Sequence, residues 1–281
     1  MKKTDLEALL KDMSLEEKIM QLVQLPGWDF QDDAAVTGLT EGNGNDKIKM
    51  LAGSTLGIFG ADRIKTLQKA YMDRHPHHIP MLFMLDVIHG HKTVLPNPLG
   101  QGATFDPDAI EKGAAMQAKE TAADGVHVTF SPMADLVRDA RWGRVLESTG
   151  EDKYLNSRMA AAMVRGYQGK DLKDTNHVAA CVKHFAAYGG AEAGRDYTNV
   201  ELSEHTLREQ YLPAYKAGID AGARLVMTSF NTLNGIPSSA NKWLMRDVLR
   251  DEMKFDGVLI SDWGAIMEIK NWGAAEDLKE A

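Results

Sequence analysis

The sequence has almost no cysteine. Among its 281 residues only Cys181 is one, and it lies in an apolar run from Val178 to Val182. A single cysteine excludes a disulfide framework. Because a thiol in apolar surroundings behaves as an inert small hydrophobe, we expect Cys181 to belong to the core and not to act as a nucleophile.

Long apolar runs are also missing. A transmembrane helix needs about 18 or more consecutive apolar residues, and the sequence contains no such stretch. The first residues, Met1 to Glu7, are mostly charged or polar and include no signal-peptide core. We therefore expect a cytoplasmic product.

Basic residues are in deficit. The chain has 32 lysines and arginines against 40 aspartates and glutamates, which gives a formal net charge of −8. A negative surface opposes binding to nucleic acid and to anionic lipid. The expected partner is a small neutral molecule, with no nucleic acid and no membrane.

Short apolar runs alternate with longer amphipathic segments. Strands are predicted at residues 54–59, 81–85, 126–130, 178–182, 225–228 and 258–260. Helical spacing occupies residues 108–124, 154–167, 202–221 and 240–252. Such alternation predicts an α/β fold with a parallel sheet, and the length suits a single barrel.

Polar side chains follow most of the predicted strands. They are Asp86, Asp135, Lys183 with His184, Ser229 to Asn231, and Asp262. A doubly wound sheet would fit the alternation as well. In a barrel, however, all these carboxyl ends meet at one mouth, where active sites lie. We therefore favour a (β/α)8 TIM-like barrel.

The predicted barrel is incomplete at its C-terminal strand. Six strands are clear, and residues 20–25 offer a seventh, although the capping-box pattern of Ser14 and Glu17 makes them the end of a helix that begins near Leu15. A last helix-like stretch covers residues 274–281. Open sheet edges favour aggregation or a homo-oligomer. Residues 28–46, rich in Gly, Asp and Asn, are predicted to form a loop.

Asp262 is the best placed carboxylate for catalysis. It follows the apolar run at residues 258–260 and precedes Trp263, an aromatic residue suited to stacking on a sugar ring. Enzymatic cleavage of a glycoside needs a pair of carboxyl groups. An aspartate at a strand end is also a common helix N-cap, so both roles are open on this evidence alone.

Six ordered motifs narrow the choice. They are Leu85 to Gly90 (LDVIHG), Ser131 to Asp135 (SPMAD), Arg141 to Arg144 (RWGR), Val182 to Phe185 (VKHF), Asn231 to Gly235 (NTLNG) and Ile260 to Gly264 (ISDWG). In this order they resemble glycoside hydrolase family 3, most closely its bacterial β-glucosidases. The resemblance implies a (β/α) barrel over residues 1–281 and a second α/β sandwich domain that is absent from this chain.

The resemblance implies a retaining, exo-acting β-glucosidase with Asp262 as the nucleophile. Asp86, Arg144, Lys183, His184 and Arg195 would then hold the nonreducing-end sugar, and Phe230 and Trp263 complete the substrate-binding set. Charged donors and acceptors on sugar hydroxyls give strong hydrogen bonds, which suits these residue types. Each assignment has an alternative.

Asp86 and Arg144 could simply form a salt bridge at the barrel mouth. A histidine after a strand is often a core residue. Consecutive strand residues point to opposite faces, so Lys183 and His184 reach one sugar only where the backbone bends. Arg141 is expected to be structural.

The resemblance assigns no residue of this chain as the general acid. In the similar β-glucosidases it is a glutamate of the second domain. Members that cleave N-acetylglucosaminides use a histidine in the loop after the VKHF strand, and residues 186–196 contain none. Glu192 in that loop is a weaker alternative.

Two alternative functions also remain open: a sugar-binding barrel with little turnover, and a β-xylosidase. The histidines near residues 75–78 and 89–91 lack a metal-ligand pattern, so we expect neither metal nor cofactor.

Overall fold

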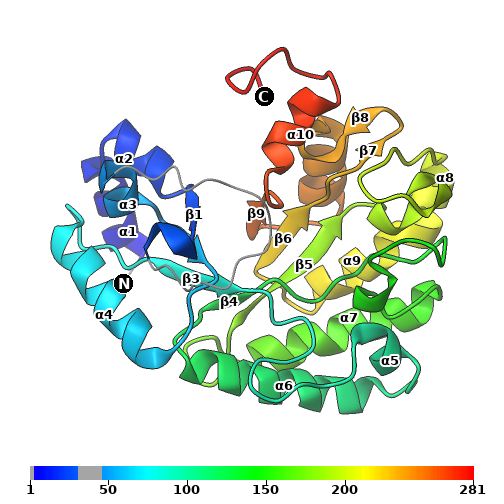
Figure 1. The fold of residues 1–281 in the computed structure, drawn as a ribbon, viewed down its shortest axis with the longest axis horizontal. Coiled ribbons are helices and arrows are strands. Elements are labelled where there is room, and N and C mark those ends of the chain that lie inside the picture. The colour runs from blue at the N-terminus through cyan, green and yellow to red at the C-terminus, as the bar shows by residue number, and fades with distance from the viewer. Residues whose placement is uncertain (1–2, 31–45) are drawn as a thin grey trace. The chain divides into compact units, whose positions relative to one another are not determined.

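The computed structural model describes residues 3–30 and 46–281, which divide into two compact units (Figure 1). Unit 1 runs to Asp86 and includes Thr121–Val128, and unit 2 comprises Val87–Glu120 and Thr129–Ala281. Most of the loop predicted over residues 28–46 lies outside the described residues. Among the described helices, none has the length and hydropathy of a membrane span.

Unit 1 is built on three parallel strands. They are β1 (Gln24–Pro26), β2 (Ser54–Leu56) and β3 (Leu82–Leu85), paired in chain order. Its helices are α1 (Lys3–Asp12), α2 (Leu15–Met20), α3 (Asp46–Leu51) and α4 (Ala61–Arg74), with a 3-10 turn η1 (Gly27–Asp29). The His127 amide donates to the Phe83 carbonyl at 2.9 Å, which leads the sheet on to β4 (Val128–Thr129).

The start of the chain confirms the capping-box prediction. The Ser14 hydroxyl accepts from the Glu17 amide, and the Glu17 carboxylate accepts from the Ser14 amide at 2.7 Å. Residues 20–25 contain both the predicted helix end and the predicted strand, because α2 ends at Met20 and β1 begins at Gln24. Helix α1 was not predicted.

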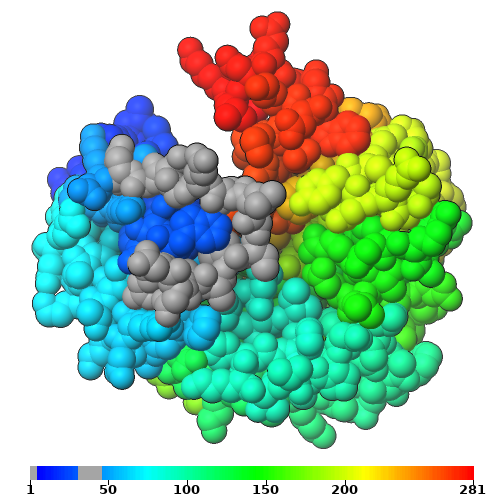
Figure 2. Space-filling model, in the orientation of Figure 1, coloured from blue at the N-terminus to red at the C-terminus, as the bar shows by residue number. Residues whose placement is uncertain are grey.

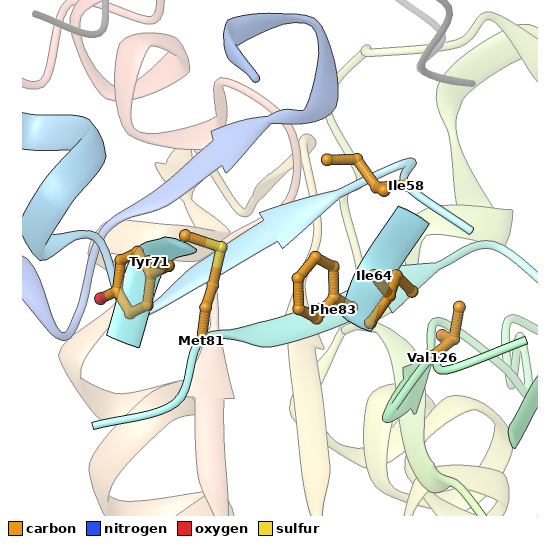
Figure 3. Close-up of a cluster of buried hydrophobic side chains, with 6 residues drawn as sticks. All are labelled: Ile58, Ile64, Tyr71, Met81, Phe83 and Val126. Carbon is orange, nitrogen blue, oxygen red and sulfur yellow. The ribbon is translucent and has the colours of Figure 1, made fainter. Parts of the chain in front are cut away.

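An apolar cluster forms the centre of unit 1 (Figure 3). Its buried members are Ile58, Ile64, Tyr71, Met81, Phe83 and Val126. The one polar atom among these side chains, the Tyr71 hydroxyl, donates to the Ala52 carbonyl at 2.8 Å. Gly125 has a φ of 88°, and a Cβ there would lie 3.0 Å from Ile64. Glycine therefore lets the chain turn closely over this cluster.

Unit 2 continues the parallel sheet in chain order. Its strands are β5 (Ala179–Phe185), β6 (Leu225–Thr228) and β9 (Val258–Ile260), and β4 leads into it through hydrogen bonds from Cys181 and Lys183 to the Ser131 and Pro132 carbonyls. A short hairpin joins β7 (Thr232–Leu233) and β8 (Ile236–Pro237). Cys181 is fully buried in β5, as predicted.

The helices of unit 2 are α5 (Pro98–Gly102), α6 (Pro107–Ala123), α7 (Lys153–Gln168), α8 (Glu204–Thr206), the π-helix η5 (Leu207–Tyr211), α9 (Leu212–Asp220), the π-helix η7 (Trp243–Glu252) and α10 (Ala265–Asn271). The helices predicted at residues 108–124, 154–167, 202–221 and 240–252 are present, whereas α5 and α10 were not predicted. Single 3-10 turns are η2 (Val145–Glu147), η3 (Tyr188–Gly190), η4 (Glu192–Gly194) and η6 (Ser238–Ala240).

The six predicted strands and the α/β class with chain-order parallel pairing are confirmed. The helix predicted at residues 274–281 is wrong. The last helix is α10, which ends at Asn271, and the residues after Gly273 form exposed turns, coloured red at the C-terminal end in Figure 2. Leu278 is 58% exposed, so this stretch has no buried face to stabilise a helix.

Candidate active site

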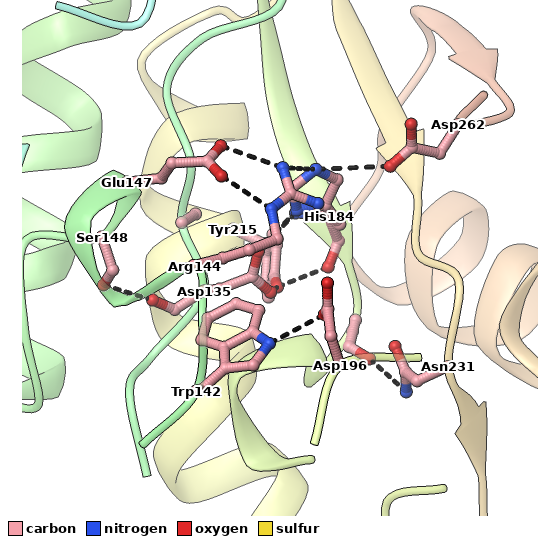
Figure 4. A network of polar contacts seen from close by, with 12 residues as sticks. Asp135, Trp142, Arg144, Glu147, Ser148, His184, Asp196, Tyr215, Asn231 and Asp262 are labelled. Carbon is pink, nitrogen blue, oxygen red and sulfur yellow. Dashed lines mark hydrogen bonds and ion pairs between the residues drawn. The ribbon is translucent and has the colours of Figure 1, made fainter. Parts of the chain in front are cut away.

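Asp262 lies at the carboxyl end of β9, two residues beyond Ile260. Its Oδ2 is 3.3 Å from Nε2 of His184, and its Oδ1 accepts from the Trp263 amide at 2.6 Å (Figure 4). The N-cap residue of α10 is Gly264, so Asp262 does not cap this helix through its side chain. The N-cap alternative for Asp262 is therefore wrong.

Arg144, in the loop after β4, contacts the same histidine and lies close enough to Asp262 for their charges to interact. Its Nε and one terminal nitrogen donate to Glu147 at 2.7 and 2.9 Å, and the terminal nitrogen also lies 3.1 Å from His184 Nε2. Burial alone would lower the pKa of Arg144, but the hydrogen bonds and charge of Glu147 outweigh it and raise the pKa. Arg144 is thus a fixed cation at the site.

Arg141 has a different environment. Its side chain is 73% exposed and pairs with Asp139 at 2.5 Å. Hydrogen bonds from Arg141 lower the Asp139 pKa to about 2. This surface pair agrees with the structural role predicted for Arg141.

Lys183 and His184 are consecutive residues of β5, and both are buried, with exposures of 4% and 0%. The pairing of β5 with β6 shifts register between Val182 and Phe185, and the Lys183–His184 peptide bond is cis. Consecutive side chains of a regular strand point to opposite faces, so the register shift is the irregularity that would let both side chains serve one site.

His184 is held from behind by Asp135. Its Nδ1 lies 2.8 Å and its backbone nitrogen 3.0 Å from Asp135 Oδ2. Burial lowers the pKa of His184 well below its usual value, and the charges of Arg144 and Lys183 lower it further. Burial raises the pKa of Asp135 to about 7, against the side-chain contact with Tyr215 and the hydrogen bond from the His184 amide. Near neutral pH the contact is therefore between a neutral imidazole and a carboxyl group whose charge is suppressed.

An aromatic cluster lies beside these charges. Phe230 stacks on Tyr197 with ring centroids 4.4 Å apart and contacts Tyr188 edge-on at 5.9 Å. The Arg144 guanidinium lies 5.5 Å from the centre of the Tyr188 ring. Trp263 packs on the same cluster. Aromatic faces next to a cation and a carboxylate suit a ring that is apolar on its faces and polar on its rim.

Two predicted sugar contacts are not brought into this cluster by a described contact. Arg195 is exposed, in a loop where its backbone amide donates to the Glu192 carbonyl. Asp86 directly follows β3 and belongs to unit 1, so its place beside Arg144 stays a prediction. Glu192, the alternative acid, is exposed and lies 3.4 Å from the Asn199 amide nitrogen.

Several residues of the cluster were not predicted. Asp135, Glu147, Tyr188, Tyr197 and Tyr215 had no role assigned from the sequence. Asp135 did carry a signal, because it follows a predicted strand and ends the SPMAD motif. Tyr215 lies 80 residues from Asp135, within an ordinary amphipathic helix, and carried none.

A metal centre finds no support among the described residues, where no cluster of three or more histidine, cysteine or acidic side chains is arranged to bind an ion. His77, from the histidine-rich segment, lies 3.4 Å from Glu17 and 3.5 Å from Asp12.

The parallel sheet, with carboxyl, imidazole and guanidinium groups at its strand ends, defines a (β/α) barrel-type domain with a polar site. Residues 14–281 match the family model described as the glycosyl hydrolase family 3 N terminal domain, and the chain belongs to this family.

Known proteins similar to the chain are longer. A periplasmic beta-glucosidase of Salmonella typhimurium is 41% identical over 274 residues, which cover 97% of this chain and 35% of that protein. The crystal structure of a beta-glucosidase from Listeria innocua in complex with isofagomine superposes with a TM-score of 0.96 at 52% identity, covering all of this chain and 39% of that one. A beta-xylosidase of Formosa agariphila is 43% identical over 178 residues, 62% of this chain and 25% of that protein.

Proposed function

We propose that the chain is the nucleophile-bearing barrel domain of a retaining β-glucosidase, with Asp262 as the nucleophile. The observation that carries the proposal is the position of Asp262 at a strand end, 3.3 Å from His184 and near the half-buried Arg144 cation. A positive neighbour favours the ionised carboxylate, the form that attacks.

The proposed reaction has two steps. Asp262 attacks the anomeric carbon of a nonreducing-end β-glucosyl residue while an acid protonates the departing oxygen, which gives a covalent α-glycosyl-enzyme. Water then attacks the same carbon and releases glucose with retained configuration. The resemblance assigns the acid to a glutamate of a second domain, and Glu192 is the weaker alternative within this chain.

The sugar is proposed to be held by charged and aromatic side chains. The buried Lys183 and His184 and the half-buried Arg144 support this, because His184 contacts both Asp262 and Arg144 and directly follows Lys183. Asp86 and Arg195 are proposed from the family motifs, with Phe230 and Trp263 as apolar contacts. A β-xylosidase is the second candidate, because the Formosa relative has that name. A domain that binds sugar with little turnover is the third.

Covalent trapping tests the nucleophile. An aryl 2-deoxy-2-fluoro-β-glucoside with an acidic phenol needs little acid assistance, and its fluorine slows release of the glycosyl-enzyme. We expect mass spectrometry to find one sugar adduct, on the peptide that contains Asp262. The Asp262→Asn variant should stay unlabelled, whereas Asp256→Asn, at an exposed aspartate just before β9, should label normally. An adduct on another carboxylate would refute the assignment.

Substrate choice, location and assembly are separate questions. Parallel assays with β-glucoside and β-xyloside distinguish the first two candidates. The cytoplasmic location is a prediction from the N-terminus, while the Salmonella relative is named periplasmic, and cell fractionation decides between them. Sedimentation tests the proposed homo-oligomer.

A further inference from the structure

The hydrogen bonds around Asp135 require one more proton than its ionised form supplies. The donors and acceptors concerned all lie within unit 2 and connect Arg144, His184, Asp135 and Tyr215 (Figure 4).

Arg144 fixes the form of the His184 ring. A guanidinium has only donors, and its nitrogen lies 3.1 Å from His184 Nε2. Of the two contacts of Nε2, the one with Arg144 at 3.1 Å is shorter than the one with Asp262 Oδ2 at 3.3 Å, and burial beside two cations favours the neutral ring. We therefore assign Nε2 as the acceptor from Arg144, and the hydrogen of the neutral imidazole is then on Nδ1. His184 is the Nδ1–H tautomer.

The Nδ1–H tautomer fixes the role of one oxygen of Asp135. Nδ1 lies 2.8 Å from Oδ2, and the His184 backbone amide lies 3.0 Å from the same oxygen. Both nitrogens are donors. Oδ2 therefore accepts two hydrogen bonds and is the carbonyl-like oxygen of the group.

Tyr215 is left with one hydrogen for two short contacts. Its oxygen lies 2.5 Å from Asp135 Oδ1 and 2.6 Å from the His184 carbonyl oxygen. A carbonyl oxygen only accepts, so it takes the phenolic hydrogen. The contact between the two oxygens at 2.5 Å then needs a hydrogen on Oδ1, and an O–H···O bond of this length is typical of a carboxylic acid donor.

We propose that Asp135 is a protonated carboxylic acid in the folded protein, donating to Tyr215 and locking His184 as the tautomer whose Nε2 lone pair accepts from Arg144. The arrangement satisfies each of these buried groups with one proton. Asp135, His184 and Tyr215 are all fully buried, so no bulk water supplies an alternative partner.

The surrounding charges are compatible with a neutral Asp135. His184 from β5 and Tyr215 from α9 contact it directly, and Arg144 and Glu147 from the turn η2 carry opposite charges that form a pair at 2.7 Å. Arg144 lowers and Glu147 raises the pKa of Asp135, so their charges oppose each other, and the neighbouring Lys183 of β5 is a further buried cation. Burial is the largest cause acting on Asp135, and it favours the protonated acid.

The lock makes Asp135 a positioning residue for His184. The single lone pair of Nε2 accepts from Arg144, so Nε2 has no hydrogen to donate to Asp262. Under the proposed function, Nε2 cannot donate to a sugar hydroxyl either.

Selective labelling tests the proton directly on the wild-type chain without sugar. With ¹³C-labelled aspartate and ¹⁵N-labelled histidine, we expect the Asp135 Cγ signal at the position of a carboxylic acid at about pH 6, with the His184 Nε2 signal unprotonated. The Asp135→Asn and His184→Gln variants assign the two signals. A carboxylate signal at this pH, or a proton on Nε2, would overturn the proposal.

A variant pair separates the proton from simple packing. Asparagine reproduces the protonated acid, with its amide donating to Tyr215 and its oxygen accepting from His184. We expect Asp135→Asn to keep the His184 tautomer, and Tyr215→Phe to shift the Asp135 Cγ signal. The control Tyr211→Phe, four residues earlier and also buried, should shift neither. A changed tautomer in Asp135→Asn would contradict the lock, and the wild-type spectra decide the matter if a variant fails to fold.

Discussion

The buried centres of the two units are made of different residues. In unit 1 the cluster around Phe83 and Met81 is apolar, and its single hydroxyl is satisfied by a carbonyl. In unit 2 the buried residues beside Asp262 include Asp135, Lys183 and His184. Burying polar groups costs free energy unless they are paired, whereas apolar burial stabilises. The first centre therefore stabilises its unit through apolar burial, whereas the second holds buried polar groups near the proposed nucleophile.

Replacing the proposed nucleophile should have the largest effect on turnover, and this effect should involve unit 2 only. We expect Asp262→Asn to lower turnover of an aryl glucoside by at least about 10⁴-fold in an active form of the enzyme, because the amide has no nucleophilic charge. Sugar binding and the free energy of unfolding should change little. Kinetics together with urea unfolding check both points. Near wild-type turnover would show that the nucleophile lies elsewhere.

The corresponding substitution in unit 1 removes apolar contacts and should affect stability but not sugar binding. Phe83 is fully buried, and Phe83→Ala should lower the free energy of unfolding by about 3 to 5 kcal/mol through lost burial and a cavity. At a temperature where the variant is folded, its affinity for a sugar analogue, measured by calorimetry, should match the wild type. Phe105→Ala, at a 74% exposed phenylalanine, is the control and should be nearly neutral. Weakened sugar binding by folded Phe83→Ala would break the division of roles.

The pH dependence of stability should reveal Asp135. Its pKa rises from 3.8 to about 7 on folding, so between these values the folded state binds more protons than the unfolded state. The contribution of Asp135 to the free energy of unfolding should therefore fall as pH rises through this window and level off above about pH 7. This contribution is at most about 4 kcal/mol. Histidines with lowered pKa values, among them His184, titrate with the opposite sign in both proteins. In urea unfolding from about pH 4 to 8, the wild-type value minus that of Asp135→Asn should therefore show the falling slope. Equal slopes would contradict the assignment.

Two helix caps allow a matched test of the units. Ser14 caps α2 in unit 1, and Ser203 caps α8 in unit 2, where its hydroxyl accepts from the Thr206 amide at 3.1 Å. Ser14→Ala and Ser203→Ala should each lower the free energy of unfolding by about 1 kcal/mol, as lost caps do. Denaturation curves measure both. A loss from Ser203 several times that from Ser14 would mean that this cap supports the polar centre as well as its helix.

Local patterns predicted the elements well where the pattern and the burial agree. The strand at residues 225–228 is apolar throughout and buried throughout, and it appears at the predicted residues. The stretch at 274–281 has helical composition but no buried face, and composition alone misled. Helix propensity is weak without tertiary packing.

From the sequence, only those site residues that lie at strand ends or in the motifs could be predicted. Asp262 and His184 meet as expected, because both follow or end strands of one parallel sheet. Tyr215 meets Asp135 through the packing of a helix on a strand, and 80 residues separate the two. No spacing rule connects them. Glu147 pairs with Arg144 three residues away, but an irregular turn sets this geometry, and irregular turns have no period to read.

Among the strands the structure describes, β9 ends the sheet order, and its first residue, Val258, is 58% exposed. Asp262 follows this strand after a single intervening residue, Ser261. A strand that pairs with β9 would therefore act on the backbone that positions the proposed nucleophile. If two copies of the chain pair through β9, self-association and ligand affinity are thermodynamically linked, and the apparent dissociation constant for a sugar then depends on protein concentration.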